Sequence, residues 1–240
     1  MSPARRAVAA SRLRAVLWDL DGTLTDSVRL VVETMNSVIA AHGGPLLPYE
    51  RVGELIGLPL DAMFRLAWPD IGAADVERYR LEYRTQYEAV AIPATRLYRG
   101  ARTTLRDFHA AGLLQGTVTG KRAADCERIL RGLGIKKDID IYLGGDSVPR
   151  PKPAPDLALY AMSRLGASPE ESVVIGDSAA DLAMGKAAGA HTIQVLWGFS
   201  RSPLPAAEQS VRTWGELRVA VFALGGPKPG ILGRRGPLRS

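Results

Sequence analysis

Short apolar runs alternate with helical patterns from Gly100 onward, and this alternation limits the fold more than any other feature. Apolar spacing near 3.6 residues predicts helices, and the runs between them have the length and composition of buried strands. The predicted helices cover about 101–111, 122–133, 155–165, 179–188 and 214–224, and the strands fall in LLQGTVTG, DIDIYLGGD, ESVVIGD and HTIQVLW. Strands that alternate with helices form a mainly parallel sheet with helices on both faces. We therefore predict an α/β, Rossmann-like core.

The segment 27–92 departs from this alternation. The apolar run RAVLWDL at 14–20 fits a first strand of the same sheet. After it, Gly- and Pro-containing breakers separate helical patterns, and no convincing strand appears. These helical patterns lie at about 27–41, 49–56, 60–67 and 73–90. We predict an all-helical cap at 27–92, inserted into a core made of 14–26 and 93–225.

The formal net charge of +6 belongs to the two ends of the chain. Residues 1–14 and 226–240 each carry four basic residues and no acid, whereas the rest carries 23 basic and 25 acidic residues. No zinc-finger, RNP or helix-turn-helix signature is present, so specific nucleic-acid binding is not expected. We predict a basic tail at 1–13 and a disordered Gly/Pro/Arg tail at 226–240.

The single cysteine, Cys126, excludes an intrachain disulfide and fits a reducing compartment. No apolar run approaches the length of a membrane span, and the N-terminus lacks the apolar region of a secretory signal. We expect a cytoplasmic protein without a membrane partner, either a monomer or a homodimer.

Polar residues gather where the predicted strands end. Ligands of parallel sheets bind at the carboxyl ends of strands. The residues at these ends are Asp19, Asp21, Thr119, Lys152, Asp177 and Asp181. Carboxylates brought together in a crevice repel one another, and a bound divalent cation relieves the repulsion. Oxygen ligands without a Cys or His cluster favour Mg²⁺ over zinc.

These residue types suit phosphoryl transfer. A carboxylate beside Mg²⁺ can attack phosphorus and form an aspartyl-phosphate. Lys152, the Thr119 hydroxyl and the Gly120 amide can hold the phosphoryl oxygens, whose charge needs positioned cations and donors. Asp21 suits the general acid that protonates the leaving oxygen and later takes a proton from water. Asp181 has an alternative role, since an acid in the first turn of a helix stabilises its N-terminus.

The segments DLDGTLTDS, TVTGK, RPKPAPD and GDSAADLAMGKAAGA resemble, in order, the four motifs of the haloacid dehalogenase-like hydrolase superfamily. The resemblance spans roughly residues 14–200, and the helical insertion is similar to the cap of its phosphoglycolate phosphatase and β-phosphoglucomutase branch. It implies that Asp19 is the nucleophile and Asp21 the acid/base. Thr119 and Lys152 would hold the phosphoryl group. Mg²⁺ would bind to Asp19, the Asp21 carbonyl and Asp177, with Asp181 as a further ligand or an anchor.

The resemblance therefore implies a phosphatase for a small phosphorylated metabolite, with phosphoglycolate as the leading single candidate. Sugar phosphates, pyrophosphate and a non-catalytic phosphate-binding role remain alternatives. A phosphosugar mutase is disfavoured because VRLVVE and GLPLDA lack the His and Arg that such mutases carry there. Gly120 stands where the second motif often has Asn, which removes a side-chain donor but keeps the amide. Arg51, Arg65 and Lys121 are candidate contacts for a substrate carboxylate or sugar.

Overall fold

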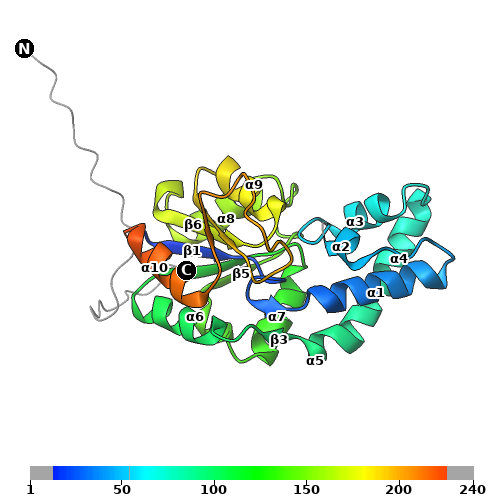
Figure 1. Cartoon of the computed structure of the whole chain (residues 1–240), viewed down its shortest axis with the longest axis horizontal. Coiled ribbons are helices and arrows are strands. Elements are labelled where there is room, and N and C mark those ends of the chain that lie inside the picture. The colour runs from blue at the N-terminus through cyan, green and yellow to red at the C-terminus, as the bar shows by residue number, and fades with distance from the viewer. Residues whose placement is uncertain (1–12, 54, 226–240) are drawn as a thin grey trace, which may run out of the picture.

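The computed structural model describes residues 13–53 and 55–225, so the predicted tails lie outside the described residues except for Leu13. Figure 1 shows two lobes, and the larger is built on a six-stranded sheet. The strands are β1 (Ala15–Trp18), β4 (Leu114–Val118), β5 (Ile141–Leu143), β6 (Ser172–Gly176), β7 (His191–Val195) and β8 (Gln209–Val211). They lie in the order β5-β4-β1-β6-β7-β8, and every pair is parallel. The α/β, Rossmann-like core is confirmed.

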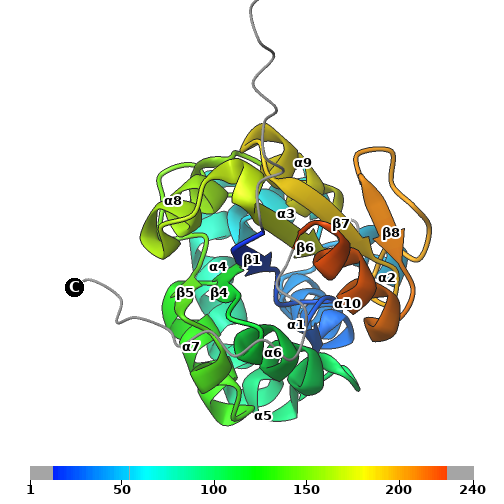
Figure 2. The ribbon, with the colours of Figure 1, turned by 90° about the vertical axis from the view of Figure 1, so that its left-hand side faces the viewer.

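Helices cover both faces of the sheet, as Figure 2 shows. One group consists of α6 (Ala101–Ala110), α7 (Ala123–Gly132) and α10 (Trp214–Ala223), and the other of α8 (Asp156–Leu165) and α9 (Ala179–Ala187). Strand β1 divides its side chains between them: Val16 and Trp18 pack with the first group, and Ala15 and Leu17 with the second. A strand that is buried on both faces reads as a continuous apolar run, which is why this strand was predictable.

Short elements complete the larger lobe. They are the 3₁₀ turns η2 (Lys136–Asp138) and η3 (Pro169–Glu171) and the edge strand β8. Strand β8 was not predicted because Val211 is its only fully buried residue and its sequence, QSV, has no apolar pattern. Within the described ranges, no helix combines the length and hydrophobicity needed to cross a bilayer.

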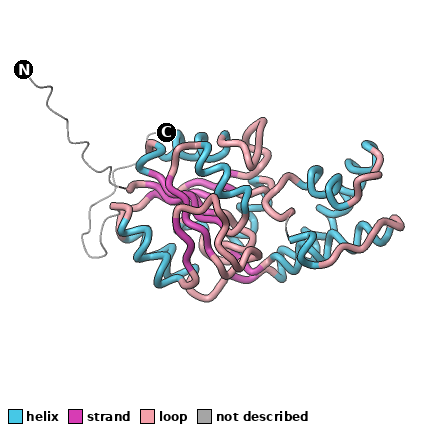
Figure 3. The backbone as a smooth tube through the Cα atoms, turned by 45° about the horizontal axis from the view of Figure 1, so that its top comes forward, coloured by secondary structure: helices cyan, strands magenta, loops and turns pink. Residues whose placement is uncertain are grey.

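The smaller lobe, which we call the cap, is helical throughout its described elements, and Figure 3 shows it apart from the sheet. Its elements are α1 (Val28–Ala41), α2 (Tyr49–Gly53), α3 (Leu60–Ala67), α4 (Ala73–Gln86), the π-helical turn η1 (Tyr87–Ala91) and α5 (Ile92–Ala94). The apolar stripe of α1, including Val31, Met35 and Ile39, packs against Phe64 and Tyr83 in a separate core. The predicted helix 73–90 is therefore one α-helix that continues into a π turn.

Two features connect the cap with the core. A two-stranded ribbon pairs β2 (Thr25–Asp26) with β3 (Arg96–Leu97) in antiparallel fashion, so the two connecting segments run side by side. Farther along, Glu88 of η1 accepts hydrogen bonds from Arg122 and Arg128 of the core at 2.6 and 3.0 Å. The cap is thus joined to the core by a narrow ribbon and by ion pairs.

Candidate active site

The carboxyl ends of three neighbouring strands place polar side chains at one edge of the sheet. Asp19 follows β1, Thr119 follows β4 and Asp177 follows β6, and all three are buried. The Asp19 amide donates to the Ile175 carbonyl at 2.9 Å, which continues the β1–β6 pairing to the edge. Strands β4 and β5 lie on one side of β1, and β6, β7 and β8 lie on the other. This edge is therefore a topological switch point, where ligands of such folds bind.

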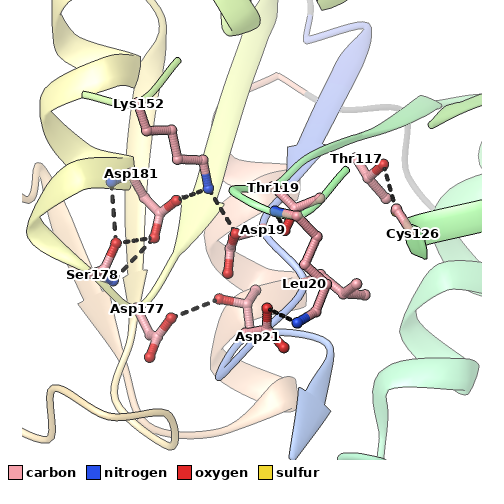
Figure 4. Close-up of polar contacts among 12 residues, drawn as sticks. Asp19, Leu20, Asp21, Thr117, Thr119, Cys126, Lys152, Asp177, Ser178 and Asp181 are labelled. Atoms are coloured by element: carbon pink, nitrogen blue, oxygen red, sulfur yellow. Dashed lines mark hydrogen bonds and ion pairs between the residues drawn. The ribbon is translucent and has the colours of Figure 1, made fainter. Parts of the chain in front are cut away.

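The Lys152 ammonium lies between the Asp19 and Asp181 carboxylates, as Figure 4 shows. The Lys152 side chain is completely buried. The ammonium donates to Asp19 Oδ1 at 2.6 Å and also to Asp181 Oδ1. Burial alone would lower the Lys152 pKa, but the charges of Asp181 and Asp19 outweigh it and the pKa is raised. Lys152 is therefore a permanent cation 133 positions from its Asp19 partner in sequence.

Three carboxylates form a buried acidic cluster beside this lysine. One oxygen each from Asp19, Asp177 and Asp181 lie within 4.8 Å of one another. Burial raises the pKa of Asp19 well above its usual range, and the neighbouring acids raise it further, whereas Lys152 opposes the rise. One ammonium cannot offset three buried carboxylates, so the site fits an additional cation. The donors are hard oxygens, which suit a divalent ion of the Mg²⁺ or Ca²⁺ type.

Asp177 is held by groups on both sides. Its Oδ1 accepts from the Thr23 hydroxyl at 3.3 Å, and its Oδ2 accepts from the Phe199 amide at 2.7 Å. Gly22, at φ 79°, lets the chain pass closely, since a Cβ there would lie 2.3 Å from Asp177 Oδ2. Burial and then the charge of Asp181 raise the pKa of Asp177 to about 7. The carboxylate is oriented but costly to ionise without a cation.

Asp181 caps helix α9 and also contacts Lys152, and its role as a metal ligand stays a prediction. Its Oδ2 accepts from the Ser178 amide at 3.1 Å and from the Ser178 hydroxyl at 2.5 Å, forming a capping box at the start of α9. Its Oδ1 contacts Lys152. The cap bonds fix the carboxylate, and the carboxylate in turn positions the lysine.

The Asp21 carboxylate points away from the acidic cluster. Its Oδ1 accepts from the Ser27 hydroxyl, and its Oδ2 pairs with Lys121 Nζ at 3.0 Å. The Lys121 ammonium also lies 4.0 Å from the centre of the Tyr87 ring in the cap. Burial alone would lower the Lys121 pKa, but the Asp21 charge and the two nearby tyrosines raise it. The Asp21 carboxylate is thus held by Ser27 and Lys121 at the boundary between core and cap.

A side chain at position 120 of the second motif would be crowded by the cap. A Cβ at this position would lie 3.2 Å from the Gly57 carbonyl and 3.3 Å from the Leu58 carbonyl of the α2–α3 loop. That loop packs against Gly120, and Gly57 itself has φ +100°. In the sequence, this GLP segment appeared as a helix breaker and as a position without the Arg of a mutase. Its position above Gly120 depends on how the cap folds back.

A cavity of about 270 Å³ lies between cap and core. Core residues Asp19, Asp21, Thr119 and Gly120 line it. Its other wall comes from the α2–α3 loop and from helices α1, α3, α4 and η1. Of the three cations suggested by sequence, Lys121 lines the cavity, whereas Arg51 and Arg65 do not. Arg80, Arg84, Tyr83, Tyr87 and Arg122 line it instead. The sequence offered no signal for these beyond their helical spacing.

The raised Asp177 pKa predicts how stability depends on pH. The folded protein holds this proton more tightly than the unfolded chain, whose value is about 3.8. That stabilising contribution is complete below about pH 4 and is lost as pH rises through about 7.

Because a cation binds the ionised form of Asp177, the cation should stabilise the folded protein more at pH 8 than at pH 5. Thermal unfolding with Mg²⁺ or EDTA at both pH values measures this. An Asp177→Asn variant should show little Mg²⁺ stabilisation, and an equal effect at both pH values would contradict the assignment.

Comparison with known proteins agrees with this geometry. The family model "Haloacid dehalogenase-like hydrolase" matches residues 16–195. The chain is 32% identical over 186 residues to a phosphoglycolate phosphatase of Xanthomonas campestris, covering 78% of this chain and 84% of the relative. It is 33% identical over 189 residues to an N-acetylmuramic acid 6-phosphate phosphatase of Pseudomonas aeruginosa, with the same coverage. A crystal structure from Bacteroides fragilis assigned to the same hydrolases has a TM-score of 0.79 and 29% identity, covering 86% of this chain and 100% of that one.

Proposed function

Because the chain belongs to the haloacid dehalogenase-like hydrolases and its relatives are phosphatases, we propose that it hydrolyses a small phosphate monoester with Mg²⁺. The reaction proceeds through an aspartyl-phosphate on Asp19. The observation that carries the proposal is the contact of the buried Lys152 ammonium with Asp19, next to Asp177 and Asp181. A lysine buried among acids in this way can stabilise the negative charge of a phosphoryl group during its transfer.

Asp19 attacks first. One of its carboxylate oxygens forms a bond to phosphorus as the bond from phosphorus to the ester oxygen breaks. Lys152, the Thr119 hydroxyl and the Gly120 amide stabilise the phosphoryl oxygens during this transfer. Asp19, the Asp21 carbonyl and Asp177 would hold Mg²⁺, which would supply further positive charge at the phosphoryl group. Asp181 acts through Lys152, which it orients.

Asp21 moves the protons. It donates one to the departing ester oxygen, and its carboxylate then accepts one from the water that attacks the aspartyl-phosphate. That attack breaks the bond between Asp19 and phosphorus, releases inorganic phosphate and restores the Asp19 carboxylate. Lys121 and Ser27 fix the Asp21 side chain for both steps. The cap over the site excludes bulk water that would weaken these interactions.

The relatives and the cavity support the proposed substrate class. Phosphoglycolate is the leading candidate because several relatives carry that name, and the cavity of about 270 Å³ suits a small molecule. A phosphosugar mutase, a pyrophosphatase and a non-catalytic phosphate-binding protein are not favoured. We further propose a cytoplasmic enzyme that works as a monomer or homodimer on a small phosphorylated metabolite.

A panel of phosphate esters tests the proposal directly. Purified protein with Mg²⁺ should release inorganic phosphate from small monoesters, 2-phosphoglycolate among them, because the site then holds its nucleophile, cation and acid. EDTA should abolish the release, and added Mg²⁺ should restore it. Phosphate release is measured colorimetrically for each ester. Undetectable release from every ester at several Mg²⁺ concentrations would refute the phosphatase.

A further inference from the structure

Four cations line the cavity between cap and core. Helix α4 contributes Arg80 and Arg84, and the core contributes Lys121 and Arg122. Three of these four have acidic partners, so their charges are already used. Lys121 pairs with Asp21 at 3.0 Å, Arg122 with Glu88 at 2.6 Å and with Asp125 at 2.8 Å, and Arg80 with Glu77 at 2.6 Å.

Arg84 is the exception. Across residues 13–53 and 55–225, no hydrogen bond or ion pair engages its guanidinium, although the side chain is partly buried. The acids whose charges act on it are Glu77 and Asp125. Glu77 is occupied by Arg80, and Arg122 donates to both oxygens of Asp125 at 2.8 and 2.9 Å. The surroundings therefore leave one uncompensated positive charge at the cavity wall.

The arrangement is also repulsive. Arg80 and Arg84 are four residues apart on one helix, a spacing at which like charges destabilise each other. Burial, followed by the charges of Arg80 and Arg122, lowers the pKa of Arg84. An anion bound beside Arg84 would relieve this repulsion.

A second unsatisfied group lies beside Arg84. Among the residues that the structure describes, none accepts a hydrogen bond from the buried Arg80 Nε–H, while the other end of its guanidinium contacts Glu77. Buried donors in native proteins are nearly always satisfied, so an isolated one at a cavity wall indicates a missing acceptor.

From these observations we propose that Arg84, assisted by Arg80, binds a carboxylate that the substrate carries in addition to its phosphate ester. The inference rests on the proposed function, because the ester end of the same molecule must reach Asp19. Two coplanar carboxylate oxygens match the fork of guanidinium donors. The small cavity favours a phosphate ester of a short organic acid over a bisphosphorylated sugar.

Binding to an Asp19→Asn protein tests the proposal without turnover. The probes are 2-phosphoglycolate and ethyl phosphate, which have the same number of carbons and differ by a carboxylate in place of a methyl group. Titration calorimetry should show 2-phosphoglycolate binding about 10- to 100-fold more tightly, as expected for a charge-assisted pair. Adding Arg84→Ala should remove this preference and leave the ethyl phosphate affinity unchanged. Arg84→Lys, which keeps the charge but not the fork, should retain only part of it.

Arg78→Ala is the matched control. Arg78 lies on the same helix but is mostly exposed and pairs with Asp75, so its loss removes the same charge without touching the cavity. It should leave the preference intact. Equal affinity for the two probes, or an Arg84→Ala loss shared by both, would overturn the proposal. Turnover of ethyl phosphate by the unmodified enzyme tests the phosphatase proposal separately. If the enzyme hydrolyses both esters equally well, the phosphatase proposal stands and the carboxylate site is refuted.

Discussion

Asp19→Asn is expected to abolish phosphate release while the protein stays folded. The amide cannot attack phosphorus, and losing the nucleophile of a covalent mechanism costs on the order of 10⁵-fold or more in kcat. The fold should tolerate the change because burial already disfavours the charged carboxylate, as its raised pKa shows. Lys152 keeps Asp181 as a partner. Phosphate release gives the activity, and thermal unfolding checks the fold.

Two variants in the same motif make this result specific. Asp26→Asn changes an exposed acid of β2 and should leave turnover near the unmodified level. Asp21→Asn should slow both steps by about 10²- to 10⁴-fold, the usual range for a general acid–base, but should not abolish them. Ordinary turnover by Asp19→Asn would refute the nucleophile assignment even if the other two variants behave as expected.

Lys152→Met should damage both stability and activity. Methionine fills similar volume but leaves the Asp19 and Asp181 carboxylates buried without their cation. Removing one partner of a buried ion pair costs about 3–5 kcal/mol in the free energy of unfolding. Losing a positioned cation at the phosphoryl group should lower kcat by about 10²- to 10³-fold. Urea unfolding and phosphate release measure the two effects.

Mg²⁺ separates the electrostatic explanation from simple loss of packing. If the damage comes from uncompensated carboxylates, Mg²⁺ should recover part of the stability of Lys152→Met, because the ion replaces some of the missing charge. Lys186→Met, an exposed lysine at the end of α9, provides the control and should resemble the unmodified protein. Unaltered stability of metal-free Lys152→Met would argue against the buried ion pairs.

The fold of the core was predictable because local sequence patterns specify it. Strand β1 is apolar on both faces, and the strands after Gly100 alternate with amphipathic helices, so a parallel sheet with a shared carboxyl edge follows from general rules. Asp19, Thr119 and Asp177 each stand immediately after a strand, which brings them to that edge. The roles given to them stay predictions until they are tested by mutation.

Contacts between cap and core could not be predicted in this way. Arg84 and Tyr87 carry no motif, and only the folding of the cap over the sheet brings them to the cavity. Gly57 appeared as a breaker, although its carbonyl packs above Gly120. Arg51 and Arg65 were proposed as contacts for a substrate carboxylate or sugar, but neither lines the cavity. Helical spacing fixes which residues share a face, not which face meets another lobe.

The ion pairs between Glu88 and the core make opening of the cap dependent on salt concentration. If the lobes separate, Arg122 and Arg128 must release Glu88. The Glu88 side chain is 35% exposed, so dissolved ions can reach it. Ions at physiological concentration screen such partly solvated charges over about 8 Å. At low salt concentration the lobes should therefore stay closed for longer, and at high salt concentration they should open more readily. If product release requires the lobes to separate, a higher salt concentration should make it faster.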